Sequence, residues 1–104
     1  MNRQAIKLVI ITEKLLLRHI VKIAETAGAS GYTVTAADGK GSRNVRSSGQ
    51  PAVSDSFSNI KVEIISASEE MARKIADEVA RKYFDNFSGI AYLDQVEVLH
   101  AQRL

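Results

Sequence analysis

Apolar residues follow two different periods along this chain, and the order of those periods is what most constrains its fold. Leu8 to Ile11 form a continuous apolar run, which is typical of a central strand buried on both faces. Apolar residues alternate with polar ones at 32–36, at 60–64 and toward the end at about 90–99. This alternation predicts three further strands.

Two segments with helical spacing separate the first strand from the second and the third from the fourth. Thr12 is expected to cap the first helix, and Gly28 is expected to end it. Ser68 is expected to cap the second helix, whose apolar positions recur every three or four residues at Ala72, Ile75, Ala76, Val79, Ala80 and Tyr83. The order βαββαβ predicts a ferredoxin-like α+β fold, in which a four-stranded antiparallel sheet carries both helices on one face.

The first strand is apolar on both faces, although both helices are expected on the same side of the sheet. Leu8 and Ile10 point to one face, and Val9 and Ile11 point to the other. A length of 104 residues fits one domain, assigned here to 1–104, and offers no further element to cover the second face. Self-association is therefore predicted, with a monomer that exposes an apolar sheet as the alternative.

A long loop between the second and third strands, at about 38–58, is a feature that a purely structural chain would not need. Hairpin loops usually take about 2–5 residues, and loops beyond about 12–15 residues are mostly functional or disordered. No acidic residue lies between Asp38 and Asp55, whereas this stretch holds Gly39, Lys40, Gly41, Ser42, Arg43 and Arg46. Glycine N–H groups, a serine hydroxyl and two guanidinium groups suit a phosphate. A solvated loop with scattered cations is the alternative, and the spacing is not that of a P-loop.

Composition excludes several function classes. The formal net charge of +2 is too small to indicate general binding of polyanions. Cysteine is absent, so disulfides, thiolate metal sites and cysteine nucleophiles are excluded. No apolar stretch reaches the length of a membrane span, and no signal peptide is evident. We therefore expect a soluble cytoplasmic protein.

Few residues suggest catalysis or metal binding. His19 and His100 are the only histidines, and neither has the spacing of a metal motif. Glu63 and Glu97 lie on predicted strands and could approach one another, although solvated or ion-paired charges are the simpler interpretation. We therefore predict no catalytic residue and no metal ligand. Gly89 either makes the turn before the last strand or lets a ligand approach the backbone.

Three stretches together resemble the PII-like signalling proteins. They are Lys7 to Lys14, Gly28 to Val34 and, most specifically, the run from Gly39 to Ser47. The resemblance covers nearly the whole chain, and within the family it is to the cyanobacterial SbtB regulators of the sodium-dependent bicarbonate transporter.

The resemblance implies a homotrimer of ferredoxin-like subunits that holds adenine nucleotides (cyclic AMP, AMP, ADP or ATP) in clefts between subunits. It further implies that the flexible T-loop, here about 38–58, regulates a membrane bicarbonate transporter in the sensing of inorganic carbon. The protein would then be cytoplasmic and would reach the membrane through that transporter. The implied nucleotide-binding residues are Lys40, Gly41, Ser42, Arg43, Arg46, Gly89, Ile90 and Tyr92.

Two departures limit what the resemblance implies. Many relatives carry a C-terminal extension with cysteines that is linked to redox control and slow nucleotide hydrolysis, whereas this sequence has no cysteine. Residues 86–92 also lack the glycine- and lysine-rich phosphate loop of typical PII nitrogen regulators. Joint sensing of ATP and 2-oxoglutarate is therefore not expected.

Two other functions compete with nucleotide signalling. A small phosphohydrolase on the same fold would need a coherent set of acids or metal ligands, which the sequence lacks. An RNA-binding module of the same topology carries stacking aromatic residues on its third strand. Here Ile60 to Ile64 hold no aromatic residue and include an acid, so we expect no nucleic-acid partner.

Overall fold

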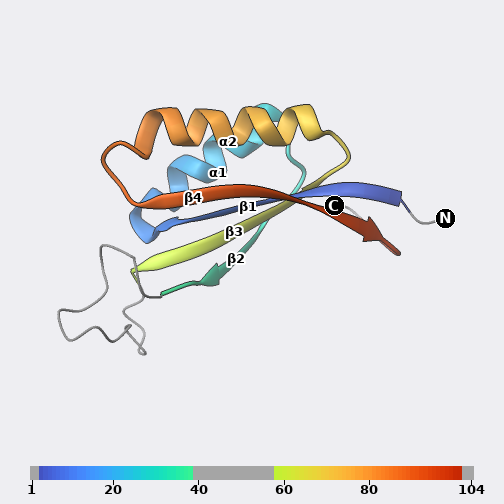
Figure 1. Ribbon diagram of the computed structural model, residues 1–104, viewed down its shortest axis with the longest axis horizontal. Coiled ribbons are helices and arrows are strands. Elements are labelled where there is room, and N and C mark those ends of the chain that lie inside the picture. Colours follow the sequence, from blue (N-terminus) through green and yellow to red (C-terminus); the bar gives the residue numbers. More distant parts are fainter. Residues whose placement is uncertain (1–2, 39–57, 102–104) are drawn as a thin grey trace.

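The computed structural model describes residues 3–38 and 58–101 and confirms the predicted order of elements. In sequence order the elements are β1 (Arg3–Glu13), a short 3-10 helix η1 (Lys14–Leu16), α1 (Leu17–Ala27), β2 (Thr33–Ala36), β3 (Asn59–Ser66), α2 (Glu69–Tyr83) and β4 (Gly89–Val98). The strands form one antiparallel sheet in the order β2-β3-β1-β4. Figure 1 shows α1 and α2 together on one side of that sheet. The predicted ferredoxin-like α+β fold is therefore confirmed.

β1 is the central strand that its apolar run predicts. It pairs with β3 on one side and with β4 on the other, so that Leu8 lies opposite both Ile64 and Leu93. β1 is nevertheless much longer than the apolar run and starts at Arg3. Residues 3–7 point to alternate faces of the sheet, and both faces receive polar and apolar side chains. The sequence therefore shows no clear strand pattern in this stretch.

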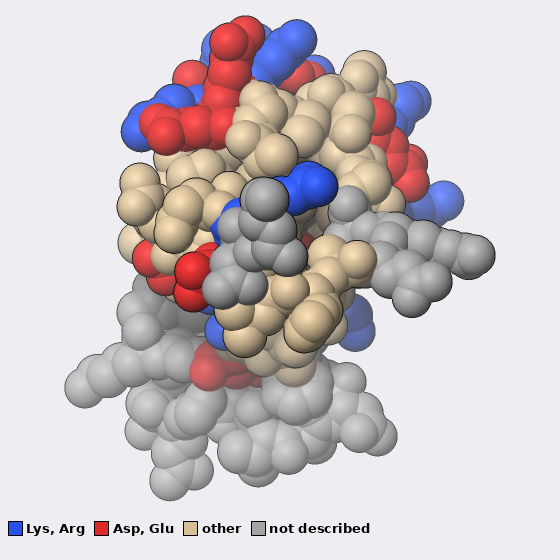
Figure 2. Space-filling model, turned by 90° about the vertical axis from the view of Figure 1, so that its right-hand side faces the viewer, with Lys and Arg blue, Asp and Glu red and all other residues tan. Residues whose placement is uncertain are grey.

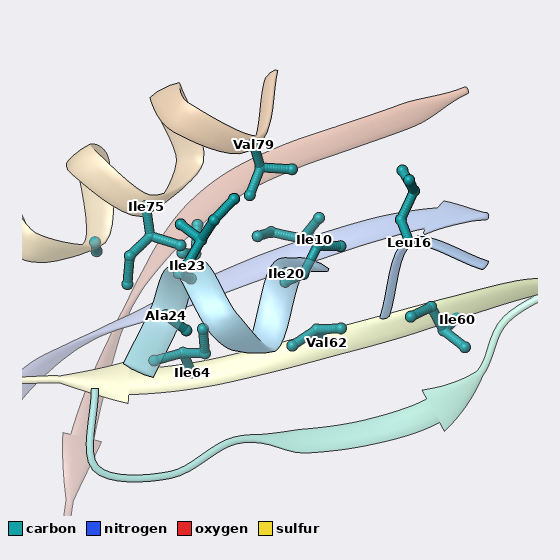
Figure 3. Packing of buried hydrophobic residues seen from close by; sticks show 12 residues of the cluster. Ile10, Leu16, Ile20, Ile23, Ala24, Ile60, Val62, Ile64, Ile75 and Val79 are labelled. Atoms are coloured by element: carbon teal, nitrogen blue, oxygen red, sulfur yellow. The ribbon is translucent and has the colours of Figure 1, made fainter. Parts of the chain in front are cut away.

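The core lies between the sheet and the two helices. Ile10 of β1 and Ile64 of β3 are buried against Ile20 of α1 and Ile75 of α2, each of them at most 1% exposed. Figure 3 shows these side chains directed toward one another from the sheet and both helices. The helical series of α2 is largely confirmed, since Ala72, Ile75 and Val79 are fully buried while Ala76 and Tyr83 pack against the cluster at its edge.

The helix ends confirm two predictions and correct a third. The Ser68 hydroxyl accepts a hydrogen bond from the Met71 N–H at 3.1 Å and caps α2. Gly28 ends α1 with a φ of 105°, a left-handed conformation that favours glycine. Thr12, however, does not cap α1, because it still belongs to β1 and the intervening turn of 3-10 helix separates it from α1. Its hydroxyl instead donates to the Ser88 carbonyl.

The outer face of α2 is charged and exposed to solvent. Arg73 pairs with Glu69 at 2.8 Å, and Lys82 pairs with Glu78 at 2.9 Å, both at helical i,i+4 spacing. The hydrogen bond from Lys82 holds the pKa of Glu78 below its usual value. In the described part of the chain, no helix is both long and apolar enough to cross a lipid bilayer.

The sheet face opposite the helices, here called the open face, mixes apolar and charged side chains. Strand alternation places on it Lys7, Val9 and Ile11 of β1, Lys61, Glu63 and Ile65 of β3, and Ile90, Tyr92 and Asp94 of β4. Val9 is only 1% exposed, whereas Ile65, Tyr92 and Ile90 are 40%, 44% and 56% exposed. Lys7 and Glu63 form an ion pair at 3.5 Å beside Val9. An apolar patch of this kind on a small domain is typical of an interface.

Candidate functional site

Four strand ends meet at one end of the sheet. β1 and β2 end there, at Glu13 and Ala36, and β3 and β4 begin there, at Asn59 and Gly89. In Figure 1 this end lies at the left, beside the turn between α2 and β4, whereas the start of β1 and the end of β4 lie at the right. The antiparallel topology thus brings together segments that are far apart in the sequence.

The turn between α2 and β4 is fastened to the end of β1. The Ser88 N–H donates to Oε2 of Glu13 at 2.8 Å, and the Ser88 hydroxyl lies 3.3 Å from the same oxygen. The Thr12 hydroxyl donates to the Ser88 carbonyl at 2.7 Å. Two consecutive residues of β1 therefore satisfy both backbone groups of Ser88.

Asp38 fastens the point where the chain leaves β2 to the point where it enters β3. Its Oδ1 accepts from the N–H of Asn59 at 3.0 Å, from the side-chain amide of Asn59 at 2.9 Å and from the N–H of Ser58 at 3.2 Å. We call Asp38, Ser58 and Asn59 the loop base. The Lys14 N–H donates to the Ser58 carbonyl at 2.7 Å. The loop base is thereby joined to the chain just beyond β1.

Of the residues predicted to bind a nucleotide, the structure describes three and places them within the first four residues of β4. Ile90 and Tyr92 lie on the open face, opposite Ile11 and Val9 of β1. Both are about half exposed. Gly89 pairs with Thr12 and belongs to the opposite, helical face. The other predicted residues, Lys40, Gly41, Ser42, Arg43 and Arg46, lie outside the described residues.

The space beside Gly89 is filled by the ring of Phe84. A Cβ atom at Gly89 would lie 2.5 Å from Cζ and 2.8 Å from Cδ1 of that ring, closer than non-bonded carbon atoms approach. This packing is enough to explain why residue 89 is a glycine, and no ligand has to be invoked. Because the Phe84 ring fills the side-chain space, a ligand at Gly89 would contact its backbone N–H or C=O group.

We expect Gly89→Ala to lower the free energy of unfolding by about 1–3 kcal/mol, because the added methyl group forces the Phe84 ring out of its place. Chemical denaturation of both proteins measures the difference. Phe84→Leu in the alanine variant serves as the control, since a smaller side chain should restore part of the loss. Equal stability of the wild type and Gly89→Ala would contradict the packing argument.

The remaining candidates from the sequence do not form a catalytic set. Glu63 pairs with Lys7 on the open face, whereas Glu97 lies opposite Gln4 on the other face, so the two carboxylates do not meet. The rings of His19 and Tyr83 contact each other in a tilted arrangement, with their centroids 5.4 Å apart. Among the described residues, no group of three or more His, Asp or Glu side chains is arranged to hold a metal ion.

One groove among the described residues lies away from Gly89, Ile90 and Tyr92, although Glu97 and His100 contribute to its lining. It measures about 820 Å³ and is found at the opposite end of the sheet, between Arg3 of β1, Ser66 of β3 and Val98 of β4. Figure 2 views that end and shows charged side chains gathered on the helical side at the top, with further charged side chains scattered among uncharged ones below. A smaller groove of about 290 Å³ lies between α2 and β4, and its lining includes Asp77, Tyr92 and Leu93.

Sequence reasoning missed the hydrogen bonds that build this end of the sheet. Glu13 was not singled out, and Thr12 was assigned to a helix cap. The sequence signal for Glu13 was an acidic residue directly after the apolar strand. The same pattern is found where a strand ends at the surface, so it does not indicate a buried carboxylate. Its contact with Ser88 joins residues 75 positions apart, a separation that no local pattern reveals.

Comparison with known proteins identifies relatives across the whole described fold. The model of the family "Nitrogen regulatory protein P-II" matches residues 5–103. A PII-like signalling protein from Thermus thermophilus is 35% identical, with a TM-score of 0.75 over 93% of this chain and 91% of its own.

Two further structures share the fold at lower identity. CPII, a nitrogen regulatory PII-like protein from Thiomonas intermedia, was solved with ADP, AMP and bicarbonate. It is 21% identical, with a TM-score of 0.74 over 98% of this chain and 100% of its own. GlnK of B. subtilis, in complex with ATP, is 18% identical, with a TM-score of 0.58 over 91% of this chain and 82% of its own.

Proposed function

The chain belongs to the P-II family, and from that premise we propose that it is a homotrimeric signalling protein that binds adenine nucleotides between its subunits. Proteins of this family are signalling regulators rather than enzymes, and they are generally trimers that bind adenine nucleotides. The observation that carries the proposal is that the loop base and the first residues of β4 flank the end of β1 at the same end of the sheet.

The nucleotide is proposed to bind at that end through two sets of residues. Ile90 and Tyr92 offer an apolar and an aromatic surface to the base and ribose, and both are exposed on the open face of the single chain. The Gly89 backbone can hydrogen-bond to the ligand. Arg43 and Arg46, with Lys40, Gly41 and Ser42, are proposed to bind the phosphates by charge-assisted hydrogen bonds.

The ligand is proposed to be one or more of cyclic AMP, AMP, ADP and ATP. The structures of CPII with ADP and AMP and of GlnK with ATP support this class of ligand. Neither relative exceeds 25% identity, so the choice among the nucleotides rests on binding experiments. No observation in the described residues favours a phosphohydrolase.

The open face is proposed to lie between subunits. Its exposed Ile65, Ile90 and Tyr92 surround the buried Val9, and neither helix covers them (Figure 1). Burying these side chains in an assembly removes apolar surface from water at about 25 cal/mol per Å². Because Ile90 and Tyr92 belong to this face, an assembly built on it would place the proposed nucleotide site at a subunit boundary.

We further propose that residues 38–58 present a nucleotide-dependent surface to a membrane bicarbonate transporter, as SbtB regulators do. The two ends of this segment are held together by Asp38. A segment anchored at its base can change its surface when a phosphate is bound nearby, while the sheet stays in place. This role concerns inorganic carbon rather than nitrogen.

Saturating AMP is expected to raise the melting temperature, because a ligand bound by the folded state alone stabilises it by about 2.7 kcal/mol at a hundredfold excess over Kd. Calorimetric titration with the four nucleotides measures the affinities. Arg43→Ala and Arg46→Ala should each weaken binding about tenfold or more. Arg73→Ala, which removes an arginine from the outer face of α2, is the matched control. Absence of binding to the wild type would overturn the nucleotide assignment.

A further inference from the structure

Glu13 is a buried acidic side chain to which the proposed function assigns no role. It is 8% exposed, although a carboxylate normally stays in water. Burial of a charge is costly unless hydrogen bonds to the charge replace the lost water. Here the backbone N–H and the hydroxyl of Ser88 both lie within hydrogen-bond distance of the same carboxylate oxygen. The position of the Ser88 turn is therefore tied to the position of this one side chain.

Thr12 holds the second backbone group of Ser88, its carbonyl. Its side chain is buried, at 2% exposure for the residue, and its hydroxyl donates to the Ser88 carbonyl, while Glu13 accepts from the Ser88 N–H. Ser88 directly precedes Gly89, the first residue of β4. Because both backbone groups of Ser88 are held, the path by which the chain enters β4 is fixed to the end of β1.

The same stretch of chain also holds the loop base. Lys14, directly after Glu13, donates its N–H to the Ser58 carbonyl, and Ser58 in turn donates its N–H to Asp38. Hydrogen bonds therefore run from Ser88 through residues 12–14 to the loop base. They link the start of β4 to the base of the segment that is proposed to supply the phosphate contacts.

We propose that Glu13 is a positioning residue, which holds the backbone entering β4 in a fixed place relative to the loop base, so that the start of β4 and the segment anchored at the loop base can contact one nucleotide. The inference rests on the proposed function. Glu13 itself points at Ser88 and needs no contact with the ligand. Glu13 affects nucleotide binding indirectly, because it fixes the positions of the Gly89 backbone and of Ile90.

Two variants test this role in the full-length protein. Glu13→Ala removes the acceptor of the Ser88 N–H. We expect it to speed hydrogen exchange at the Ser88 amide at least about tenfold in the nucleotide-free protein and to weaken AMP binding about tenfold. Glu13→Gln keeps an amide oxygen that can accept the same hydrogen bond, so it should restore most of the protection and most of the affinity. Glu25→Ala, at an exposed acid on α1, is the control and should change neither measurement.

The two readouts distinguish the outcomes. Unchanged exchange at Ser88 in Glu13→Ala would overturn the proposed hold on the turn. A freed Ser88 amide with wild-type AMP affinity would overturn the positioning role. If the wild type itself binds no AMP, the proposed function fails, whereas the exchange data still decide whether Glu13 holds the turn. If Glu13→Ala does not fold, Thr12→Val replaces it, because it frees the other backbone group of Ser88 and should weaken AMP binding in the same direction.

Discussion

Ile90→Asp is expected to split the proposed trimer into single chains that keep their fold. Ile90 is 56% exposed in the single chain, so the fold loses little when it is replaced. In the assembly the same change removes about 1.5–3 kcal/mol of apolar burial and places an unpaired charge in the interface. The loss occurs once for every subunit, which makes it the largest effect that we expect from one surface substitution.

Light scattering coupled to size-exclusion chromatography measures the change in mass. Lys22→Asp, on the exposed side of α1, alters the charge of the helical face and serves as the control that should leave the mass unchanged. Circular dichroism checks that the separated chains remain folded. An aspartate variant with the mass of three chains would show that the open face does not form the interface.

Deletion of residues 42–54 is expected to abolish capture of a bicarbonate transporter while sparing the fold and the assembly. Asp38 already joins the two ends of the loop by hydrogen bonds to Ser58 and Asn59. The residues that remain, 39–41 and 55–57, are enough to connect two points that are in contact. The pairings of the described strands therefore stay in place, and most of the proposed partner surface is removed.

A pull-down with transporter-containing membranes, with each nucleotide in turn, tests this expectation. The double variant Arg43→Ala/Arg46→Ala is compared in the same experiment, because it keeps the length of the segment and removes only the proposed phosphate contacts. Capture by the deletion variant at the level of the wild type would contradict the proposed role of residues 38–58.

The elements of the fold were predictable wherever a local signal decides the structure. The helical spacing of α2 and its cap at Ser68 depend on residues a few positions apart, and Gly28 ends α1 through its own conformational freedom. The end of β1 was not predictable in this way. Thr12 has the side chain of a helix cap, but pairing with β3 and β4 extends the strand through it, and tertiary pairing overrides local preference.

The candidate site was predictable only in part. Gly89, Ile90 and Tyr92 were assigned together, yet the alternation of β4 directs the side chains of Ile90 and Tyr92 to the open face, whereas the Cα–H of Gly89 faces the helices. Which of the two faces carries Ile90 and Tyr92 depends on the register of β4 against β1, which a single sequence does not define. The hydrogen bonds of Glu13 and Asp38 were invisible for a related reason, since each joins parts of the chain that meet only after the sheet has formed.

β2 is the strand that is held least firmly in the sheet. It has four residues, pairs with only β3 among the described strands, and lies at the edge next to the loop base, whereas β1 pairs with two neighbours. Short and largely exposed edge elements open at a small fraction of the free energy of global unfolding. A force applied through the 38–58 segment would therefore detach β2 first and leave β3, β1 and β4 joined, so the molecule can yield at its edge without losing its core.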